Sequence, residues 1–301
     1  MIVTITGASG FVGKNLSIFL QNKECTTNAL SLRNKNWKKD FSKSADAVIH
    51  LAGKAHDTSN VSDPDEYYKI NRDLTIELFN EFLNSEIKKF FYFSSVKAAA
   101  DSVEDILTED EVTNPVTHYG KSKIEAEKYI LGQNLPEGKK VYIIRPCMIH
   151  GPGNKGNLNL LYKIVEKGVP WPLASFHNQR SFLGIDNLNY LIYEMLRNDL
   201  QSGIYNFADD GALSTNELIF TINKVLGKKE KLWKISKNLI EKTAGLGDKL
   251  KLPLNSERLK KLTESYVVSN QKIKSALGIE KLPLTAEEGL IKTIKSFKRE
   301  K

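Results

Sequence analysis

Short apolar runs alternate with longer amphipathic stretches along the first half of the chain. Runs of four or five apolar or β-branched residues predict buried strands, and apolar residues three or four positions apart predict helices. Strands are therefore expected at 2–6, 29–32, 47–51, 90–93 and 141–144, and helices at 11–21, 67–83 and 119–131. Strands that alternate with helices form a parallel sheet through right-handed crossovers. The pattern predicts a doubly wound α/β domain, whose ligands lie beyond the carboxyl ends of the strands.

The pattern changes near residue 150. A glycine-rich loop at 151–156 precedes helices of mixed amphipathicity, and one further strand is expected at 203–207. Ser214 and Glu217 have the spacing of a capping box, which predicts a helix that starts there. These features predict a first domain of residues 1–150, joined by a returning segment at about 181–208, and a smaller, mostly helical second domain of residues 151–180 and 209–301.

Composition narrows the class of protein. The 301 residues are 41% hydrophobic and 27% charged, as in ordinary globular proteins, and no run approaches the roughly 18 apolar residues of a membrane span. The N-terminus shows no cleavable signal sequence. Cys25 and Cys147 are too few for a disulfide framework and lack zinc-ligand spacing. We therefore expect reduced cysteines, no bound metal and a cytoplasmic location.

The net charge of +8 raises the question of an anionic partner. Lysines are spread along the chain, and the densest groups lie at 228–234 and 292–301. A solvated, lysine-rich surface is the simplest interpretation, and a membrane surface or an acidic partner is the alternative. Aromatic residues are not interleaved with the basic ones, which argues against nucleic acid as the main partner.

Gly7, Gly10 and Gly13 lie between the first predicted strand and the first predicted helix. Gly7 can adopt a backbone conformation that other residues avoid, Gly10 removes a side chain from the path of a ligand, and Gly13 allows the helix to pack close to the sheet. The helix that starts with Phe11 and Val12 has free N–H groups and a positive dipole end at this turn, which favours the phosphates of a dinucleotide. A plain glycine-rich turn is the alternative, because the G-x-x-G-x-x-G spacing is one residue longer than the usual fingerprint.

Five segments occur in the order found in one enzyme family. They are TGASGFVG (6–13), AVIHLAG (47–53), INRDLT (70–75), YGKSK (119–123) and RPCMIHGPG (145–153). With them the chain resembles the extended short-chain dehydrogenase/reductases of the NAD-dependent epimerase/dehydratase family, and segments 178–188 and 203–218 resemble its later parts. The resemblance implies a Rossmann-type doubly wound parallel sheet that binds the dinucleotide and a smaller, mostly helical C-terminal domain that binds the substrate. It also implies a possible homodimer through helices 67–83 and 119–131.

The end of the second predicted strand bears on the choice of cofactor. A carboxylate about 20 residues beyond the glycine turn binds the ribose of NAD in such folds, but this chain has Ser31, Arg33 and Lys35 there. Because a guanidinium forms bidentate hydrogen bonds with a phosphate, Arg33 favours NADP(H); NAD(H) stays possible if Arg33 is merely solvated. By the resemblance, Asp40 and Phe41 flank the adenine, Leu51, Ala52, Gly53 and Ser94 line the inner cofactor path, and Asn71 supports the active site.

Tyr119 and Lys123 are four residues apart on a predicted helix, so their side chains share one face. A neighbouring ammonium and a nearby oxidised nicotinamide are expected to lower the pKa of a tyrosine, whose ordinary value of about 10 is too high for a ready base. Tyr119 is then suited to move a proton while a hydride moves to or from a nicotinamide. By the resemblance, Ser95 completes a Ser–Tyr–Lys catalytic set and Ser94 is the alternative. A Tyr-x-x-x-Lys pair without any function is common on surface helices.

The residues after Ser95 bear on the type of reaction. Sugar-nucleotide dehydratases of the family have an Asp-Glu pair at that place, and this chain has Val96 and Lys97. Without two carboxylates, elimination of water has no acid–base agent, so a 4,6-dehydratase is rejected. The resemblance leaves an NADPH-dependent 4-keto-sugar reductase of surface-polysaccharide synthesis, which we favour, and an NAD-dependent UDP-sugar 4-epimerase. A catalytically silent protein that senses the cofactor is the non-enzymatic alternative.

A UDP-sugar is the expected substrate on the strength of the resemblance. It implies that Arg180 binds the diphosphate, that Asn157 meets the nucleotide and that His56 contacts the sugar. Arg180 as an ordinary surface arginine and His56 as a polar surface residue are the alternatives. Arg145 is expected to be structural and to pair with a carboxylate at the boundary between the two domains.

Overall fold

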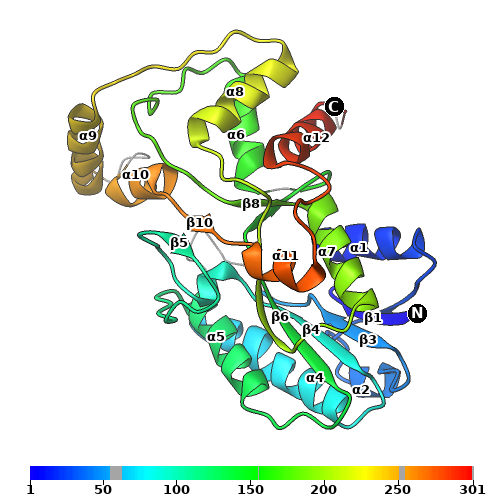
Figure 1. Cartoon of the computed structure of the whole chain (residues 1–301). Coiled ribbons are helices and arrows are strands. Elements are labelled where there is room, and N and C mark those ends of the chain that lie inside the picture. The colour runs from blue at the N-terminus through cyan, green and yellow to red at the C-terminus, as the bar shows by residue number, and fades with distance from the viewer. Residues whose placement is uncertain (55–62, 155, 251–254, 300–301) are drawn as a thin grey trace.

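The computed structural model describes residues 1–54, 63–154, 156–250 and 255–299 (Figure 1). The strands are β1 (Ile2–Thr6), β2 (Thr26–Leu30), β3 (Ala47–His50), β4 (Lys89–Phe93), β5 (Ile106–Leu107), β6 (Lys140–Pro146), β7 (Met148–His150), β8 (Phe182–Gly184), β9 (Gly203–Phe207) and β10 (Val267–Val268). The longer helices are α1 (Phe11–Gln21), α4 (Leu74–Leu83), α5 (His118–Leu131), α6 (Asn157–Glu166), α7 (Ile185–Arg197), α8 (Thr215–Leu226), α9 (Lys237–Leu250), α10 (Ser256–Thr263) and α12 (Ala286–Arg299). The shorter ones are α2 (Trp37–Asp40), α3 (Pro64–Tyr68), the π-helical turn η1 (Lys69–Asp73), the 3-10 turn η2 (Val96–Ala98) and α11 (Gln271–Leu277).

Six parallel strands form the central sheet in the order β2-β1-β3-β4-β6-β9. At the carboxyl end of β1, Thr6 lies beside Leu30 of β2 and His50 of β3. The chain leaves β1 for one neighbour and later returns on its other side, so the direction of the crossovers reverses between β1 and β3. Ligands of such sheets bind outside the carboxyl ends of the strands at this reversal. The sequence expectation of a doubly wound parallel sheet is therefore confirmed.

Both faces of the sheet are buried, which explains the nearly continuous apolar runs of its strands. On β3 and β4, Ala47, Ile49 and Phe91 pack in the same cluster as α1 and α7. The alternate residues Val48 and Phe90 pack in a second cluster with α4 and α5. Figure 1 shows α4 and α5 on one side of the sheet and α1 and α7 on the other. Helices thus cover the sheet as in a doubly wound fold.

Two predicted elements differ from the observed ones. The second strand is Thr26–Leu30 rather than 29–32, because Thr26 and Thr27 pair with Ile2 and Val3 and the chain turns after Leu30. The helix expected at 67–83 starts earlier, at Pro64, where the Asp63 side chain accepts a hydrogen bond from the N–H of Asp65. It also contains the π-helical turn η1, which places Asn71 inward.

A third hydrophobic cluster lies in the second half of the chain. It contains residues of α6, α8, α9, α10 and α12 together with Trp171 and Leu173. The capping box expected at Ser214 and Glu217 is present at the start of α8, with both reciprocal hydrogen bonds. The division into two domains at residues 150, 180 and 208 stays a prediction.

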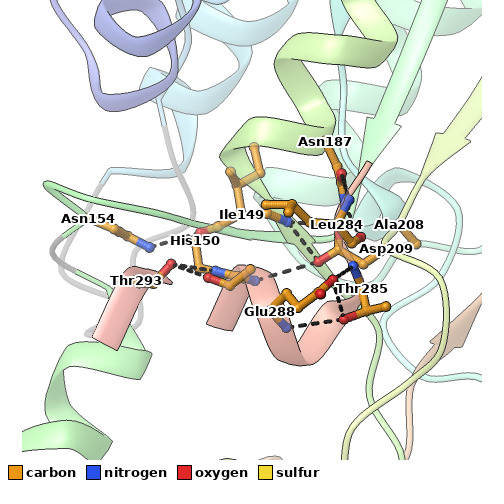
Figure 2. A network of polar contacts seen from close by, with 12 residues as sticks. Ile149, His150, Asn154, Asn187, Ala208, Asp209, Leu284, Thr285, Glu288 and Thr293 are labelled. Atoms are coloured by element: carbon orange, nitrogen blue, oxygen red, sulfur yellow. Dashed lines mark hydrogen bonds and ion pairs between the residues drawn. The ribbon is translucent and has the colours of Figure 1, made fainter. Parts of the chain in front are cut away.

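A buried polar network ties α12 to the sheet region (Figure 2). His150, at the end of β7, contacts Thr293 of α12 through Nδ1 over 2.9 Å, and its Nε2 lies 3.6 Å from Oδ2 of Asp209. The Thr293 hydroxyl donates to the Gly289 carbonyl, so it accepts from His150. Asp209 also accepts hydrogen bonds from the Gly184 N–H and the Asn187 side chain. These contacts hold the C-terminal helix against the segment that follows β9.

Candidate active site

The chain segments that follow β1, β3 and β4 form the candidate site. Gly7 follows β1, and a Cβ placed on it would lie 2.7 Å from the Ala52 nitrogen that follows β3. Its φ of +70° is in the left-handed region, which favours glycine. A Cβ on Gly53 would lie 3.3 Å from Nζ of Lys123, so the α5 side chain also reaches this edge. The reversal of the sheet and the predicted catalytic helix therefore meet at one place.

The turn between β1 and α1 has the shape of a phosphate cradle. Gly10 donates to the Gly7 carbonyl over 3.0 Å and precedes α1 without a side chain that could cap the helix. Gly13 packs against the turn rather than against the sheet, because a Cβ on it would lie 2.3 Å from the Gly7 oxygen and 2.6 Å from Cα of Ala8. The first N–H groups of α1, at Phe11 and Val12, thus lie at a positive helix end that fits the pyrophosphate of a dinucleotide.

Three residues of one face of α5 point toward the sheet: Tyr119, Lys123 and Glu127. Lys123 is buried, donates from Nζ to the Phe93 carbonyl over 2.8 Å and lies 4.9 Å from the ring centre of Tyr92. Burial lowers the pKa of Lys123 to about 8, and the Glu127 carboxylate opposes that shift. The ammonium is therefore held inside the site and keeps its charge near neutral pH.

Ser95 lies close enough to the Tyr119 hydroxyl to lower the pKa of Tyr119, so the two groups that the resemblance pairs lie near each other. Ser95 also accepts from the Lys97 N–H over 3.2 Å as the cap of η2. The neighbouring Ser94 has a different environment, because its hydroxyl donates to the Glu127 carboxylate. The geometry brings Ser95 and not Ser94 to the Tyr119 hydroxyl.

The pKa of Tyr119 is raised in the chain by itself. Burial raises it above the ordinary value of a tyrosine, the hydrogen bond from Ser95 partly offsets this, and Tyr67, whose ring lies 6.2 Å away, adds to the rise. The Lys123 ammonium is directed at the Phe93 carbonyl. The lowering expected from this ammonium together with an oxidised nicotinamide stays a prediction.

Asn71 is fully buried and connects the site to the π-helical turn. Its side-chain oxygen accepts from the Lys54 N–H over 2.8 Å, and its amide donates to the Lys54 carbonyl and to Ser122, both over 3.1 Å. Its own carbonyl accepts from Thr75 over 2.8 Å. Asn71 thus fixes the segment after Gly53 to α5, which agrees with the supporting position expected for it.

Glu127 is a site residue that the sequence reasoning missed. It forms a fully buried ion pair with Arg145, whose Nη2 lies 2.5 Å from Oε2. The pair joins α5 to β6, so the carboxylate partner expected for Arg145 exists but does not lie at a boundary between the two predicted domains. Continuing the four-residue spacing of Tyr119 and Lys123 by one step would have found Glu127.

His50 is a second residue that the sequence reasoning missed. It is buried at the end of β3 between two threonine hydroxyls, 2.7 Å from Thr6 and 2.9 Å from Thr75. Because the Thr75 hydroxyl donates to the Asn71 carbonyl, it accepts from His50, and the imidazole carries its proton on Nε2. Burial, and then Lys123, lower its pKa to about 3, so the ring is neutral.

The residues expected around the adenosine lie beyond β2. Arg33 is exposed in the turn that follows Leu30, and Asp40 is exposed and accepts from Asn34 over 3.3 Å. The Phe41 ring is buried in the cluster with Trp37. The expectation that Asp40 and Phe41 flank the adenine stays a prediction.

The structure describes only some of the residues that are expected to bind the substrate. Arg180 is half-buried and donates from Nη1 to the Lys261 carbonyl over 2.7 Å. Burial lowers the pKa of Lys97, and the charge of Arg180 adds to this lowering. Lys97 lies 4.2 Å from the ring centre of Tyr266, beside the loop of Ser95. Asn157 starts α6. His56 lies outside the described residues.

Comparison with known proteins agrees with this arrangement. The model of the "NAD dependent epimerase/dehydratase family" matches residues 3–208. The chain is 29% identical to a UDP-glucose 4-epimerase of Vibrio cholerae over 98% of this chain and 95% of that protein. It is 30% identical to a GDP-6-deoxy-D-mannose reductase of Pseudomonas aeruginosa over 71% of this chain and 77% of that protein.

Solved structures share the whole fold. RMD from Pseudomonas aeruginosa, complexed with NADPH, superposes with a TM-score of 0.76 at 20% identity and covers 99% of both chains. Among the described residues, no helix is both long and apolar enough to span a membrane. The family model covers more than half of the chain, including the glycine turn, Ser95, Tyr119 and Lys123. The protein is an enzyme of the NAD-dependent epimerase/dehydratase family, within the extended short-chain dehydrogenase/reductases.

Proposed function

We propose that this enzyme is an NADPH-dependent reductase that acts on C4 of a 4-keto UDP-sugar and provides precursors of surface polysaccharides in the cytoplasm. The observation that carries the proposal is the exposed Arg33 in the turn after β2, where no carboxylate lies from Ser31 to Asn36. Reduction of a ketone needs an acid at the carbonyl oxygen, and Tyr119 is suited to that role. An epimerase uses the same residue, so the preference for the reductase rests on the cofactor that Arg33 suits.

The residues divide the work of a carbonyl reduction. A bound dihydronicotinamide supplies the hydride to the carbonyl carbon. Ser95 and Tyr119 hydrogen-bond the carbonyl oxygen, and Tyr119 transfers its hydroxyl proton to that oxygen as the alcohol forms. Lys123 holds the ribose hydroxyls of the cofactor through its ammonium, while Asn71 keeps α5 in position.

Positive charges lie at the two ends of the site where the cofactor and the substrate are expected, and they support NADP(H) and a nucleotide sugar as the ligands. No carboxylate lies between Ser31 and Asn36, and the exposed Arg33 suits the 2′-phosphate of NADP(H). The turn that Gly7, Gly10 and Gly13 allow lets the first N–H groups of α1 bind the pyrophosphate of the cofactor. At the other end, Arg180 and Lys97 lie near each other and suit the diphosphate of a nucleotide sugar. The relatives whose names specify UDP- and GDP-sugars support this substrate class.

A UDP-sugar 4-epimerase is the second candidate, favoured by the Vibrio cholerae relative, which the chain matches over nearly its whole length. An epimerase keeps its nicotinamide and returns the hydride to the opposite face of the same carbon. The substrate-contacting roles of His56 and Asn157, and a homodimer through α4 and α5, stay predictions in either case.

The test supplies the purified enzyme with NADPH and a UDP-4-keto-6-deoxy-N-acetylhexosamine, generated by a dehydratase in the same vessel. A reductase consumes one NADPH for each keto sugar and forms the 4-hydroxy product. An epimerase consumes no added cofactor and interconverts UDP-glucose with UDP-galactose, or the N-acetylated pair, which proton NMR distinguishes. Cofactor binding without either reaction would favour the silent sensing protein and refute the proposal.

A further inference from the structure

The Tyr266 hydroxyl contacts the loop that carries Ser95. Tyr266 lies directly before β10, and its side chain is buried. Its hydroxyl oxygen lies 2.7 Å from the Ala100 carbonyl oxygen and 3.1 Å from the Val96 carbonyl oxygen. A phenol has one proton, so Tyr266 shares this donor between a carbonyl at the start of η2 and one just after its end. The phenol therefore closes the turn that follows Ser95.

The turn η2 fixes the direction of the Ser95 hydroxyl. The Ser95 side chain accepts from the Lys97 N–H over 3.2 Å, and the Ser95 carbonyl accepts from the Ala98 N–H over 2.9 Å. Both bonds belong to the turn whose carbonyls Tyr266 holds, so a displacement of this turn moves the Ser95 hydroxyl relative to Tyr119. Tyr266 is thereby connected to the reacting groups through the backbone of the loop.

The backbone of Tyr266 pairs with the segment that carries Arg180. Its N–H donates to the Gln179 carbonyl over 2.8 Å, and its carbonyl accepts from the Ser181 N–H over 3.0 Å. Arg180 lies between these two partners and is the residue expected to bind the diphosphate of the substrate. Tyr266 therefore joins this arginine, through its main chain, to the loop of Ser95, through its side chain.

The ring and the proton of Tyr266 are themselves held in place. The Lys97 ammonium lies 4.2 Å from the ring centre and donates to the Asp101 carbonyl over 2.7 Å. Burial raises the pKa of Tyr266 well above the ordinary value of a tyrosine. The phenol therefore keeps the proton with which it holds the two carbonyls.

We propose that Tyr266 is a positioning residue, which keeps Ser95 aligned with Tyr119 and with the sugar of a substrate whose diphosphate Arg180 binds. This role rests on the proposed function, in which Ser95 and Tyr119 act on the sugar. Tyr266 takes no part in the chemical step, because its hydroxyl is used by two backbone carbonyls. Its contribution is geometric, and misplacing a reacting group by about 1 Å lowers the rate of an enzyme by about a hundredfold.

The test uses Tyr266→Phe in the full-length enzyme, which keeps the ring beneath Lys97 and removes only the hydroxyl. In whichever of the two C4 reactions the enzyme catalyses, kcat is expected to fall by about tenfold to a hundredfold. The Kd values of NADPH and of UDP are expected to stay close to those of the parent. Tyr142→Phe is the matched control, because Tyr142 is buried in β6 and donates to the Leu200 carbonyl over 3.3 Å. It loses the same kind of bond and is expected to leave kcat unchanged.

A double-mutant cycle with Ser95→Ala separates positioning from a general structural effect. If Tyr266 acts through the Ser95 hydroxyl, Tyr266→Phe should lower kcat by less than about twofold once that hydroxyl is absent. Equal losses from Tyr266→Phe with and without the Ser95 hydroxyl would overturn the inference, because they would show that the two residues act independently.

Hydrogen exchange of the loop gives a readout that needs no activity. The amides of residues 98–100 donate inside the turn, so their exchange is expected to become about threefold faster or more in Tyr266→Phe and to stay parental in Tyr142→Phe. Unchanged exchange in Tyr266→Phe would overturn the inference.

Ser95→Ala alone distinguishes the two levels of the account. A parental rate of Ser95→Ala would refute the catalytic role that the proposed function gives to Ser95. A lowered rate of Ser95→Ala beside a parental rate of Tyr266→Phe would refute the positioning role of Tyr266 and leave the proposed function standing.

Discussion

Lys123 donates a hydrogen bond from Nζ to the backbone carbonyl oxygen of Phe93, over 2.8 Å. Phe93 ends β4, and Ser94 and Ser95 follow at once. The bond therefore fixes the helix that carries Tyr119 against the loop that carries Ser95. The position of the two serines on that loop decides which of them takes part in the reaction.

Ser95→Ala is expected to lower kcat by about tenfold to a hundredfold, because it removes the hydroxyl beside Tyr119. It also removes the cap of η2, which costs about 0.5–2 kcal/mol of unfolding free energy. Ser94→Ala is the matched control. It leaves the buried Glu127 without that donor and is expected to cost about 1–3 kcal/mol of unfolding free energy while kcat changes little. Steady-state kinetics and urea unfolding of both variants check this. The reverse pattern would assign the catalytic hydroxyl to Ser94.

Gly13→Ala is expected to destabilise the protein by about 1–3 kcal/mol and to abolish tight cofactor binding, since its Cβ would meet the Gly7 oxygen and Ala8 at backbone contacts that cannot give way. Gly245→Ala, in α9, has open space around its Cβ and is expected to raise stability by about 0.5–1 kcal/mol. Thermal unfolding with and without NADPH measures both effects. A Gly13→Ala protein that binds the cofactor normally would contradict the assigned turn.

His50 should make stability fall in acid. Its folded pKa of about 3 is below the ordinary 6.5, so the unfolded chain takes up a proton first as the pH falls. The contribution is present above pH 6.5 and is lost by about 1.4 kcal/mol per pH unit between 6.5 and 3. Urea unfolding from pH 7 to pH 4 is expected to show a shallower pH dependence for His50→Gln. His177→Gln, at an exposed position, should leave the slope unchanged; a His50→Gln slope like that of the parent would contradict the assignment.

The sequence predicted the parts of the site that depend on local spacing. The glycine turn and the shared face of Tyr119 and Lys123 follow from the spacing of residues in a strand, a turn and a helix, whereas the role of Ser95 was inferred from the family resemblance. The alternation of Ile49 and Val48 between two faces also follows from strand geometry. Parallel pairing, which brings Thr6 beside His50, follows from the order of strands and helices.

Contacts between residues that are far apart in the chain could not be predicted from the sequence. Tyr67, 52 positions away, adds to the rise that burial causes in the pKa of Tyr119, and the role of His50 depends on Thr6 and Thr75. The Phe41 ring faces the core because Trp37 and its neighbours pack there, which no local spacing indicates. Side-chain direction and protonation are thus set by packing, which a pattern of apolar residues does not describe.

Arg33→Asp tests the cofactor preference. The exchange removes the group suited to a 2′-phosphate and supplies a carboxylate suited to a ribose hydroxyl, so the Kd of NADPH should rise by about tenfold or more relative to that of NADH. Lys35→Gln, two residues away and also exposed, controls for general charge. Fluorescence titration with both cofactors measures the ratio, and equal changes for NADPH and NADH would contradict the role of Arg33.

The most direct test of the account is NADPH oxidation by Tyr119→Phe with the 4-keto UDP-sugar. The variant keeps the ring contact with Tyr67 and loses only the hydroxyl that donates the proton. We predict that kcat falls by about a hundredfold to ten-thousandfold while the Kd of NADPH stays close to that of the parent. A variant that reduces the keto sugar at the parental rate would contradict the central claim that Tyr119 is the catalytic acid.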